Sequence, residues 1–246
     1  MGNRLALSGW NRQDRPMHHY SPETLIKSYA LGVFPMAESH DDERIFFVDP
    51  EQRGVIPLDP PHLNRSMRKL IRNSPYQVTI NTAFADVIDG CRQITDTRTD
   101  TWINHPIRQL YCALHRLGFA HSLEVWDRKI TDSHPHSDER VPHLIGGLYG
   151  VACAGAFFGE SMFSRASNAS KLALLHLIAR LRHGGFVLLD TQFLNPHLVQ
   201  FGCHEISRAM FQEKLQHALT VTARLPMDDD PTAMLNQLLQ DSTVIS

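Results

Sequence analysis

The stretch from residue 145 to residue 197 constrains the fold of this 246-residue chain more than any other part of the sequence. It begins with an apolar, glycine-rich run that ends near Glu160. It continues with a helix expected over residues 168–183 and closes with a second apolar run that ends at Asp190. A pair of glycines stops the helix, as is common at helix C-termini. A strand, one helix and a further strand in this order predict a crossover connection inside one mixed sheet.

The other segments add helices and strands to the same α/β unit. Residues 20–32 carry the signals of a helix, with Ser21 as N-cap and Pro22 in the first turn. We expect further helices at residues 64–73, 82–91, 106–117 and 207–219, and strands at residues 77–80, 120–126, 143–153, 156–160 and 186–190. The polar segment 131–142 is expected to be a solvated loop between two strands, and residues 228–246 a peripheral tail.

Prolines divide the chain into two unequal parts. The segment 33–61 is rich in proline, which suits turns and short edge strands rather than a long helix. We therefore predict a small mixed N-terminal domain over residues 1–61. A larger domain with a mixed α/β (α+β) sheet is expected over residues 62–246.

The composition is that of an ordinary globular protein, with 42% hydrophobic and 20% charged residues. The net charge of −2 excludes a general attraction to polyanions, so any nucleic-acid contact must come from a local basic patch. The four cysteines form no CxxC pair, and the sequence lacks the pattern of a secretory leader or a membrane-spanning helix. These features predict a reduced, cytoplasmic protein with no membrane partner.

Three polar side chains at predicted strand ends are candidates for chemistry. Asp190 and Gln192 lie two residues apart, so in an extended strand they project to the same face and could orient an amine or a carbonyl. The alternative is that Asp190 caps the following turn while Gln192 is solvated. Glu160 leaves an apolar run where the backbone turns, and burial there would raise the pKa of its carboxyl group. The alternative for Glu160 is a salt bridge to Arg165.

Apolar residues near these acids could line a pocket or simply fill the core between sheet and helix. Core packing is the default for residues of this kind, although Met also suits a pocket that accepts more than one apolar shape. Trp102 could stack on a base or plug the domain boundary. The apolar residues concerned are Leu148, Phe157, Met162, Phe163, Leu177 and Leu181.

A basic helix face is expected within residues 64–73. Arg65, Arg68, Lys69 and Arg72 recur there at helical spacing, and the surrounding residues include no acid. This face is either a solvated helix surface or a contact surface for phosphates.

Several signatures are missing. Neither a GxxxxGK[ST] loop nor a GxGxxG fingerprint occurs, so the sequence gives no support for a nucleotide cofactor. The start of the helix at 168–183 also lacks the glycine-rich turn that holds coenzyme A in acetyltransferases of the GNAT fold. His134, His136, Asp138 and His143 lie in the polar segment without a metal-site spacing, so we expect no metal.

The most specific sequence motifs together resemble one enzyme family. They are LGVFP at residues 31–35, RSM at 65–67, SPY at 74–76, TWI at 101–103, SLEVW at 122–126, GGLYGV at 146–151, GESMFSR at 159–165, NASK at 168–171 and DTQFLN at 190–195. They cover most of the chain and resemble those of the leucyl/phenylalanyl-tRNA–protein transferases.

The resemblance implies an enzyme that moves Leu, Phe or Met from aminoacyl-tRNA to the N-terminal Arg or Lys of a protein. This transfer marks the acceptor for degradation in the N-degron pathway. The resemblance further implies a GNAT-like C-terminal domain behind a small N-terminal domain, with no cofactor and no metal. We expect a monomer.

The resemblance also implies roles for individual residues. Asp190 and Gln192 would position and activate the incoming α-amine, and Glu160 would orient the acceptor N-terminus. The implied substrate-binding residues are Trp102, Leu148, Phe157, Met162, Phe163, Ser164, Leu177, Leu181 and Asn195. The acceptor stem of the tRNA would lie on Arg65, Arg68, Lys69 and Arg72.

Two other classes of protein compete with this interpretation. A catalytically silent RNA-binding protein could use the same basic helix, but phosphate binding alone requires neither Asp190 with Gln192 nor Glu160. A GNAT acetyltransferase is disfavoured by the missing glycine-rich turn.

Overall fold

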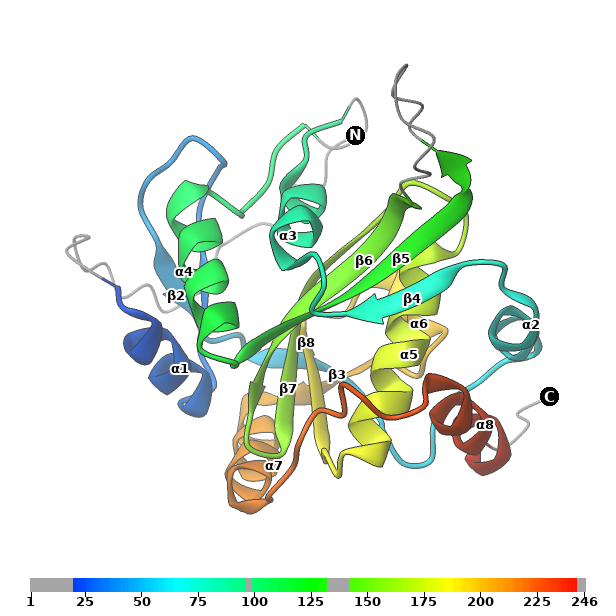
Figure 1. The fold of residues 1–246 in the computed structure, drawn as a ribbon. Coiled ribbons are helices and arrows are strands. Elements are labelled where there is room, and N and C mark those ends of the chain that lie inside the picture. The colour runs from blue at the N-terminus through cyan, green and yellow to red at the C-terminus, as the bar shows by residue number, and fades with distance from the viewer. Residues whose placement is uncertain (1–19, 96–98, 132–141, 243–246) are drawn as a thin grey trace.

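The centre of the molecule is a seven-stranded mixed sheet with the strand order β4-β5-β6-β7-β8-β3-β9 (Figure 1). The computed structural model describes residues 20–95, 99–131 and 142–242. The strands of this sheet are β3 (Gln52–Ile56), β4 (Gln77–Ile80), β5 (Ala120–Thr131), β6 (Pro142–Cys153), β7 (Ala156–Ser164), β8 (Leu188–Gln192) and β9 (His204–Ser207). Strands β7 and β8 are parallel, and the other neighbouring pairs are antiparallel. The mixed sheet expected from the sequence is thus confirmed.

Helices cover both faces of the sheet (Figure 1). One hydrophobic cluster joins the first face to α1 (Pro22–Ala30), α3 (Phe84–Arg92), α4 (His105–Arg116) and α7 (Arg208–Thr220). A second cluster joins the opposite face to α2 (Arg65–Asn73), α5 (Ala169–His183), α6 (Pro196–Val199) and α8 (Pro231–Asp241). Helix α5 is the predicted crossover between β7 and β8, and its central residues are buried.

Alternation along the central strands explains this arrangement. Phe158 and Leu188 belong to the cluster on the first face, whereas their neighbours Phe157 and Leu189 belong to the cluster on the other. Successive side chains of a strand point to opposite faces, so a run that is apolar at every position must be covered on both sides. The apolar runs in the sequence therefore become central strands.

The N-terminal region contributes a small sheet and one strand of the large sheet. Strands β1 (Phe34–Met36) and β2 (Phe46–Val48) pair antiparallel. Strand β3 precedes the domain boundary predicted at Pro61, yet it lies between β8 and β9 in the large sheet. Strand β3 therefore connects the N-terminal region to the large sheet, and the division into two domains at Pro61 stays a prediction.

Most predicted elements are present, and two predictions are wrong. The tail expected at residues 228–246 includes helix α8, which is capped by Asp230 and packs against α5. Met234, Leu235 and Leu238 are buried there, so this helix completes the core on its face. The strand expected to end at Glu160 continues as β7 to Ser164, so Glu160 lies within a strand and not at a turn. Strand β8 extends to Gln192, two residues beyond its predicted end.

The polar segment lies between two paired strands as expected, but its end residues Thr131 and Pro142 belong to β5 and β6 and pair with each other. The rest of the predicted loop, including His134, His136 and Asp138, lies outside the described residues. Within the described ranges no group of three or more His, Cys, Asp or Glu residues could hold a metal ion. In the same ranges no helix is long and apolar enough to cross a bilayer.

Candidate active site

A cavity opens where strands β7 and β8 part. Their parallel pairing ends with Phe158 opposite Asp190, while β7 continues to Ser164 and β8 turns away after Gln192. The space beside this gap is a cavity of about 780 Å³. Pockets of this size hold small-molecule substrates, which makes this the candidate active site.

Most of the residues proposed from the sequence as substrate-binding line this cavity. They are Trp102, Leu148, Met162, Phe163, Ser164, Leu177 and Asn195, and Glu160 and Gln192 lie on the same wall. Phe157 and Leu181 do not line it, because both are fully buried in the core between the sheet and α5. Further apolar lining comes from Phe34, Met36, Ile56, Leu174, Leu189, Phe193 and Leu198. The cavity is thus an apolar slot with a few polar groups.

Glu160 presents a carboxylate to the cavity from strand β7. Its side chain is only 9% exposed. Oε2 accepts a hydrogen bond of 2.7 Å from the hydroxyl of Tyr111 on α4, and that hydroxyl in turn bonds to Tyr29 on α1. Nε2 of Gln192 lies 3.5 Å from Oε1. One carboxylate oxygen is therefore anchored, and the other is held weakly at the cavity wall.

Burial raises the pKa of the Glu160 carboxyl to about 7. Hydrogen bonds from the tyrosines oppose the shift, and the negative charge of Asp190 adds to it. Burial also raises the pKa of Tyr111 well above its ordinary value, so this phenol remains a proton donor to the carboxylate. Glu160 can consequently gain or lose a proton near neutral pH. Arg165, the alternative partner considered from the sequence, instead donates to the Leu144 carbonyl and to Gln93.

Asp190 lies behind this wall and does not line the cavity. Its carboxylate is fully buried and forms a two-point ion pair with Arg53 of β3, with Nε–Oδ1 and Nη2–Oδ2 distances of 2.7 and 2.9 Å. The guanidinium also donates to the Gly32 carbonyl and lies over the rings of Phe34 and Phe211. A buried charge needs such a partner, and here the pairing is complete.

The same carboxylate fixes Gln192. Asp190 Oδ1 accepts from the backbone N–H of Gln192 at 3.1 Å, and Oδ2 accepts from its side-chain Nε2 at 3.0 Å. Gln192 has a φ of 59° and is the central residue of a tight turn closed by Phe193 N–H and Thr191 O. A non-glycine residue in this region of φ is strained and is held there by its surroundings. Asp190 thus caps the turn, as in the simpler alternative, but the Gln192 side chain is buried rather than solvated.

Asn195 and Trp102 occupy other parts of the cavity wall. Asn195 caps the short helix α6 through a bond from His197 N–H to Oδ1. Trp102 packs against the core on the side of α1, α3 and α4, and its carbonyl accepts from Ala37 N–H. It therefore lines the cavity and also packs against the core, and its stacking on a base stays a prediction.

The predicted basic face is present on α2, but its four cations are not equivalent. Arg65, Lys69 and Arg72 are exposed. Arg68 instead donates to the carbonyls of Leu239 and Ser242 at the end of α8, and to the Ser242 hydroxyl. Three of the four cations are available to phosphates, while Arg68 fastens the C-terminal helix.

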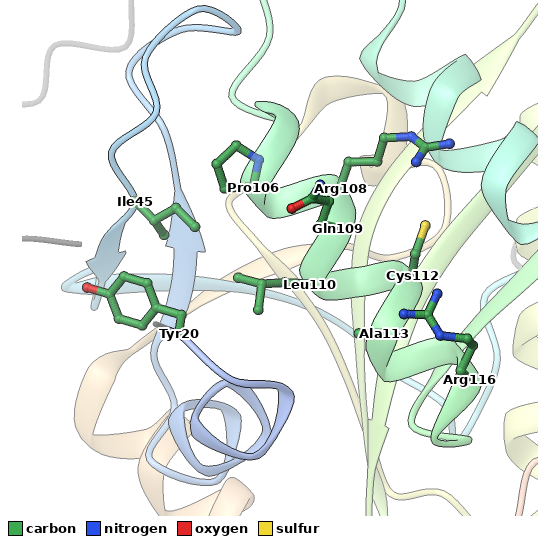
Figure 2. A pocket seen from close by; sticks show the side chains of 9 residues that line it. All are labelled: Tyr20, Ile45, Pro106, Arg108, Gln109, Leu110, Cys112, Ala113 and Arg116. Carbon is green, nitrogen blue, oxygen red and sulfur yellow. The ribbon is translucent and has the colours of Figure 1, made fainter. Parts of the chain in front are cut away.

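A second pocket of about 640 Å³ lies on the outer side of α4 (Figure 2). Arg108, Gln109, Cys112 and Arg116 line it from the helix, opposite Tyr20 and Ile45. No carboxylate lines it in the described part of the chain, and burial raises the pKa of the Cys112 thiol. This pocket therefore offers no base and no activated nucleophile, in contrast to the cavity at Glu160.

Sequence reasoning missed Arg53, Tyr29 and Tyr111. Each is fully buried and comes from an element that is distant in the chain from the acids it serves. Arg53 and Asp190 are 137 residues apart, and Tyr111 and Glu160 are 49 apart. An arginine in a short strand was an available signal, since a charged residue in a buried strand requires a partner.

Comparison with known proteins identifies the chain. Residues 55–216 match the family model of the leucyl/phenylalanyl-tRNA protein transferases, and residues 19–51 match the model of their N-terminal domain. The leucyl/phenylalanyl-tRNA–protein transferase of Hyphomonas neptunium is 53% identical over 204 residues, which cover 83% of this chain and 74% of the relative. That of Phenylobacterium zucineum is 49% identical over 207 residues, which cover 84% and 88%.

A solved structure of FemX aligns with a TM-score of 0.49 and 13% identity, over 75% of this chain and 66% of that one. The sequence similarities define the chain as an aminoacyltransferase. It belongs to the leucyl/phenylalanyl-tRNA–protein transferase family.

Proposed function

We propose that this protein transfers Leu, Phe or Met from aminoacyl-tRNA to the N-terminal Arg or Lys of an acceptor protein. The observation that carries the proposal is the cavity of about 780 Å³, which combines a long apolar slot with Glu160 and Gln192 on one wall. The slot suits an unbranched or γ-branched apolar side chain and an adenine base. The polar wall suits an amine that must lose a proton.

The aminoacyl ester is already activated, so transfer to an amine requires no nucleotide hydrolysis. The enzyme has to hold the α-amine against the ester carbon, accept one proton from the amine and stabilise the tetrahedral intermediate. The amine nitrogen forms the new C–N bond, the ester C–O bond breaks, and the ribose oxygen leaves with a proton. A carboxylate whose pKa is about 7 suits the proton transfers.

We assign the proton to Oε1 of Glu160, a residue that lines the cavity and whose Oε1 has a long contact of 3.5 Å to Gln192. Gln192 lies beside it, and its amide can orient the amine or the ester carbonyl. Asp190 touches neither substrate in this proposal. It is a positioning residue that holds both the backbone and the amide of Gln192, with its own charge neutralised by Arg53.

We further infer that the exposed cations Arg65, Lys69 and Arg72 contact the acceptor stem and that Trp102 stacks near the terminal adenosine. The mixed sheet, with one parallel pair joined across α5, supports a GNAT-like C-terminal domain. We also propose that the protein acts in the cytoplasm as a monomer, needs no cofactor or metal, and marks acceptors for the N-degron pathway.

The test is transfer of labelled Leu from Leu-tRNA to a peptide that begins with Arg or Lys. We expect transfer to that peptide, no transfer to its Nα-acetylated form, and transfer of Phe and Met as well. Binding of tRNA without transfer from any of the three would contradict the proposal and favour a silent RNA-binding protein.

A further inference from the structure

The cavity has a charged group that the reaction described above does not use. Lys171, in the first turn of α5, is the single lysine among the described lining residues, and no arginine is found among them. It is half-buried. The described part of the chain shows no ion pair or hydrogen bond of its ammonium group. Its side chain is therefore available to a ligand bound in the cavity.

Lys171 and Glu160 lie at different ends of the cavity wall. Glu160 is in the middle of β7, whereas Lys171 follows the end of that strand at Ser164. A strand rises by about 3.3 Å per residue, so Ser164 lies roughly 13 Å from Glu160 along β7. Ser164 and Ser170, which are bonded to each other through Ser170 N–H and the Ser164 hydroxyl, line the same end of the cavity. The wall therefore has an acidic region and, farther along, a basic and hydroxyl-rich region.

We propose that Lys171 binds the phosphate that joins the terminal adenosine of the tRNA to the preceding nucleotide. This inference rests on the proposed function. The aminoacyl-tRNA carries one phosphate per nucleotide, and the ester lies only one ribose away from the first of them. In this proposal the ester carbon lies beside Glu160, and that phosphate lies farther along the wall at Lys171. An ammonium group binds a phosphate oxygen through a charge-assisted hydrogen bond.

The acceptor protein is a less suitable ligand for Lys171. Its N-terminus carries an α-amine next to an Arg or Lys side chain, which a lysine repels and Glu160 attracts. Lys171 and Glu160 therefore favour different substrates at different places along the wall. The polyanionic donor binds at Lys171, and the cationic acceptor binds at Glu160. A carboxylate farther along the acceptor polypeptide is the competing ligand for Lys171. Comparison of donors with and without this phosphate distinguishes the two ligands.

The experiment compares donors that differ by one phosphate. Leu-tRNA, the leucyl ester of the dinucleotide cytidylyl-adenosine and the leucyl ester of adenosine are used with wild-type protein and Lys171→Met. For the first two donors we expect kcat/KM to fall by about 10- to 100-fold, the range for removal of a hydrogen bond to a charged group. For leucyl-adenosine we expect less than a twofold change. The slope of log KM for Leu-tRNA against log salt should decrease by roughly one.

Two control variants complete the design. Lys171→Arg keeps the charge and should retain most of the activity with every donor. Lys214→Met removes an exposed lysine of α7 and should change nothing. An equal loss with all three donors, an unchanged salt slope, or a rise in KM for the acceptor peptide alone would overturn the assignment. Absence of transfer by the wild-type protein from every donor would instead contradict the proposed function itself.

Discussion

The region around Asp190 and the region around Glu160 both bury a carboxylate, but they treat it in opposite ways. Asp190 meets a guanidinium at 2.7 Å and is sealed from the cavity. Among the described residues the hydrogen-bond donors to Glu160 are neutral side chains, and burial raises its pKa to about 7. The ion pair with Arg53 engages both carboxylate oxygens of Asp190, whereas burial beside neutral donors raises the pKa of Glu160 and lets it exchange a proton near neutral pH. Both acids are buried, so the difference in their roles comes from their partners. Arg53 makes Asp190 a structural residue, and the neutral donors leave Glu160 able to take part in chemistry.

The largest expected effect is on the ion pair. Arg53→Met leaves Asp190 buried without its cation, which should lower the free energy of unfolding by about 3–5 kcal/mol. Urea unfolding measures the loss, and transfer activity should disappear with the fold. The double variant Arg53→Met/Asp190→Leu should recover most of the stability, because the unpaired charge is gone, but not the activity. If Arg53→Met were as stable as wild type, the ion pair between Arg53 and Asp190 would not stabilise the fold.

The second prediction concerns chemistry at Glu160. Glu160→Gln keeps the shape and the bond from Tyr111 but cannot accept the amine proton. We expect single-turnover transfer at pH 8 to slow by roughly 10²- to 10⁴-fold, the usual contribution of a general base. The affinity for Leu-tRNA should stay within about twofold, as judged by filter binding. Wild-type rates in this variant would assign the proton to another group.

The third prediction concerns stability at Glu160. The folded-state pKa of about 7 lies above the ordinary value of 4.5, so folding favours the protonated acid. The contribution of Glu160 to stability is therefore full below about pH 4.5 and is lost as the pH rises to 7. Relative to wild type, Glu160→Gln should gain up to about 3 kcal/mol between these limits. Denaturant unfolding at pH 4.5 and pH 8 measures this difference, and a constant difference would contradict the raised pKa.

The smallest expected effects separate the four cations of α2. Reversing charge at Arg65 and Lys69 should lower the salt slope of tRNA binding by roughly one unit for each phosphate that the protein no longer neutralises. Arg68→Ala should leave the slope unchanged and instead loosen α8, which hydrogen exchange can detect. An unchanged slope after both reversals would move the tRNA surface away from α2.

The sequence predicted most elements of the large sheet because their signals are local. The Gly184 and Gly185 pair and the apolar runs of β6, β7 and β8 each lie within a short window. Helix α8 was missed because its acidic start, Asp228 to Asp230, suggested a solvated tail. Asp230 as N-cap and the helical spacing of Met234, Leu235 and Leu238 are nevertheless sequence signals that predict this helix.

The site was less predictable than the fold. Glu160 and Gln192 could be named from the apolar runs that lead to them and from family resemblance, although Glu160 lies in the middle of β7 and not at its end. Arg53 could not be paired with Asp190, because that contact depends on the order of β8 and β3 in the sheet. The roles of the two acids follow from that tertiary contact, so sequence alone could not separate them.

The most direct test of the central claim is the pH dependence of single-turnover transfer in wild type and in Glu160→Gln. For wild type we expect the rate to rise with an apparent pKa near 7 as Glu160 ionises. In Glu160→Gln this transition should vanish and leave a slow rate that follows only the acceptor α-amine, near pH 8. A transition near pH 7 that persists in Glu160→Gln at an undiminished rate would contradict the assignment of Glu160 as the proton acceptor.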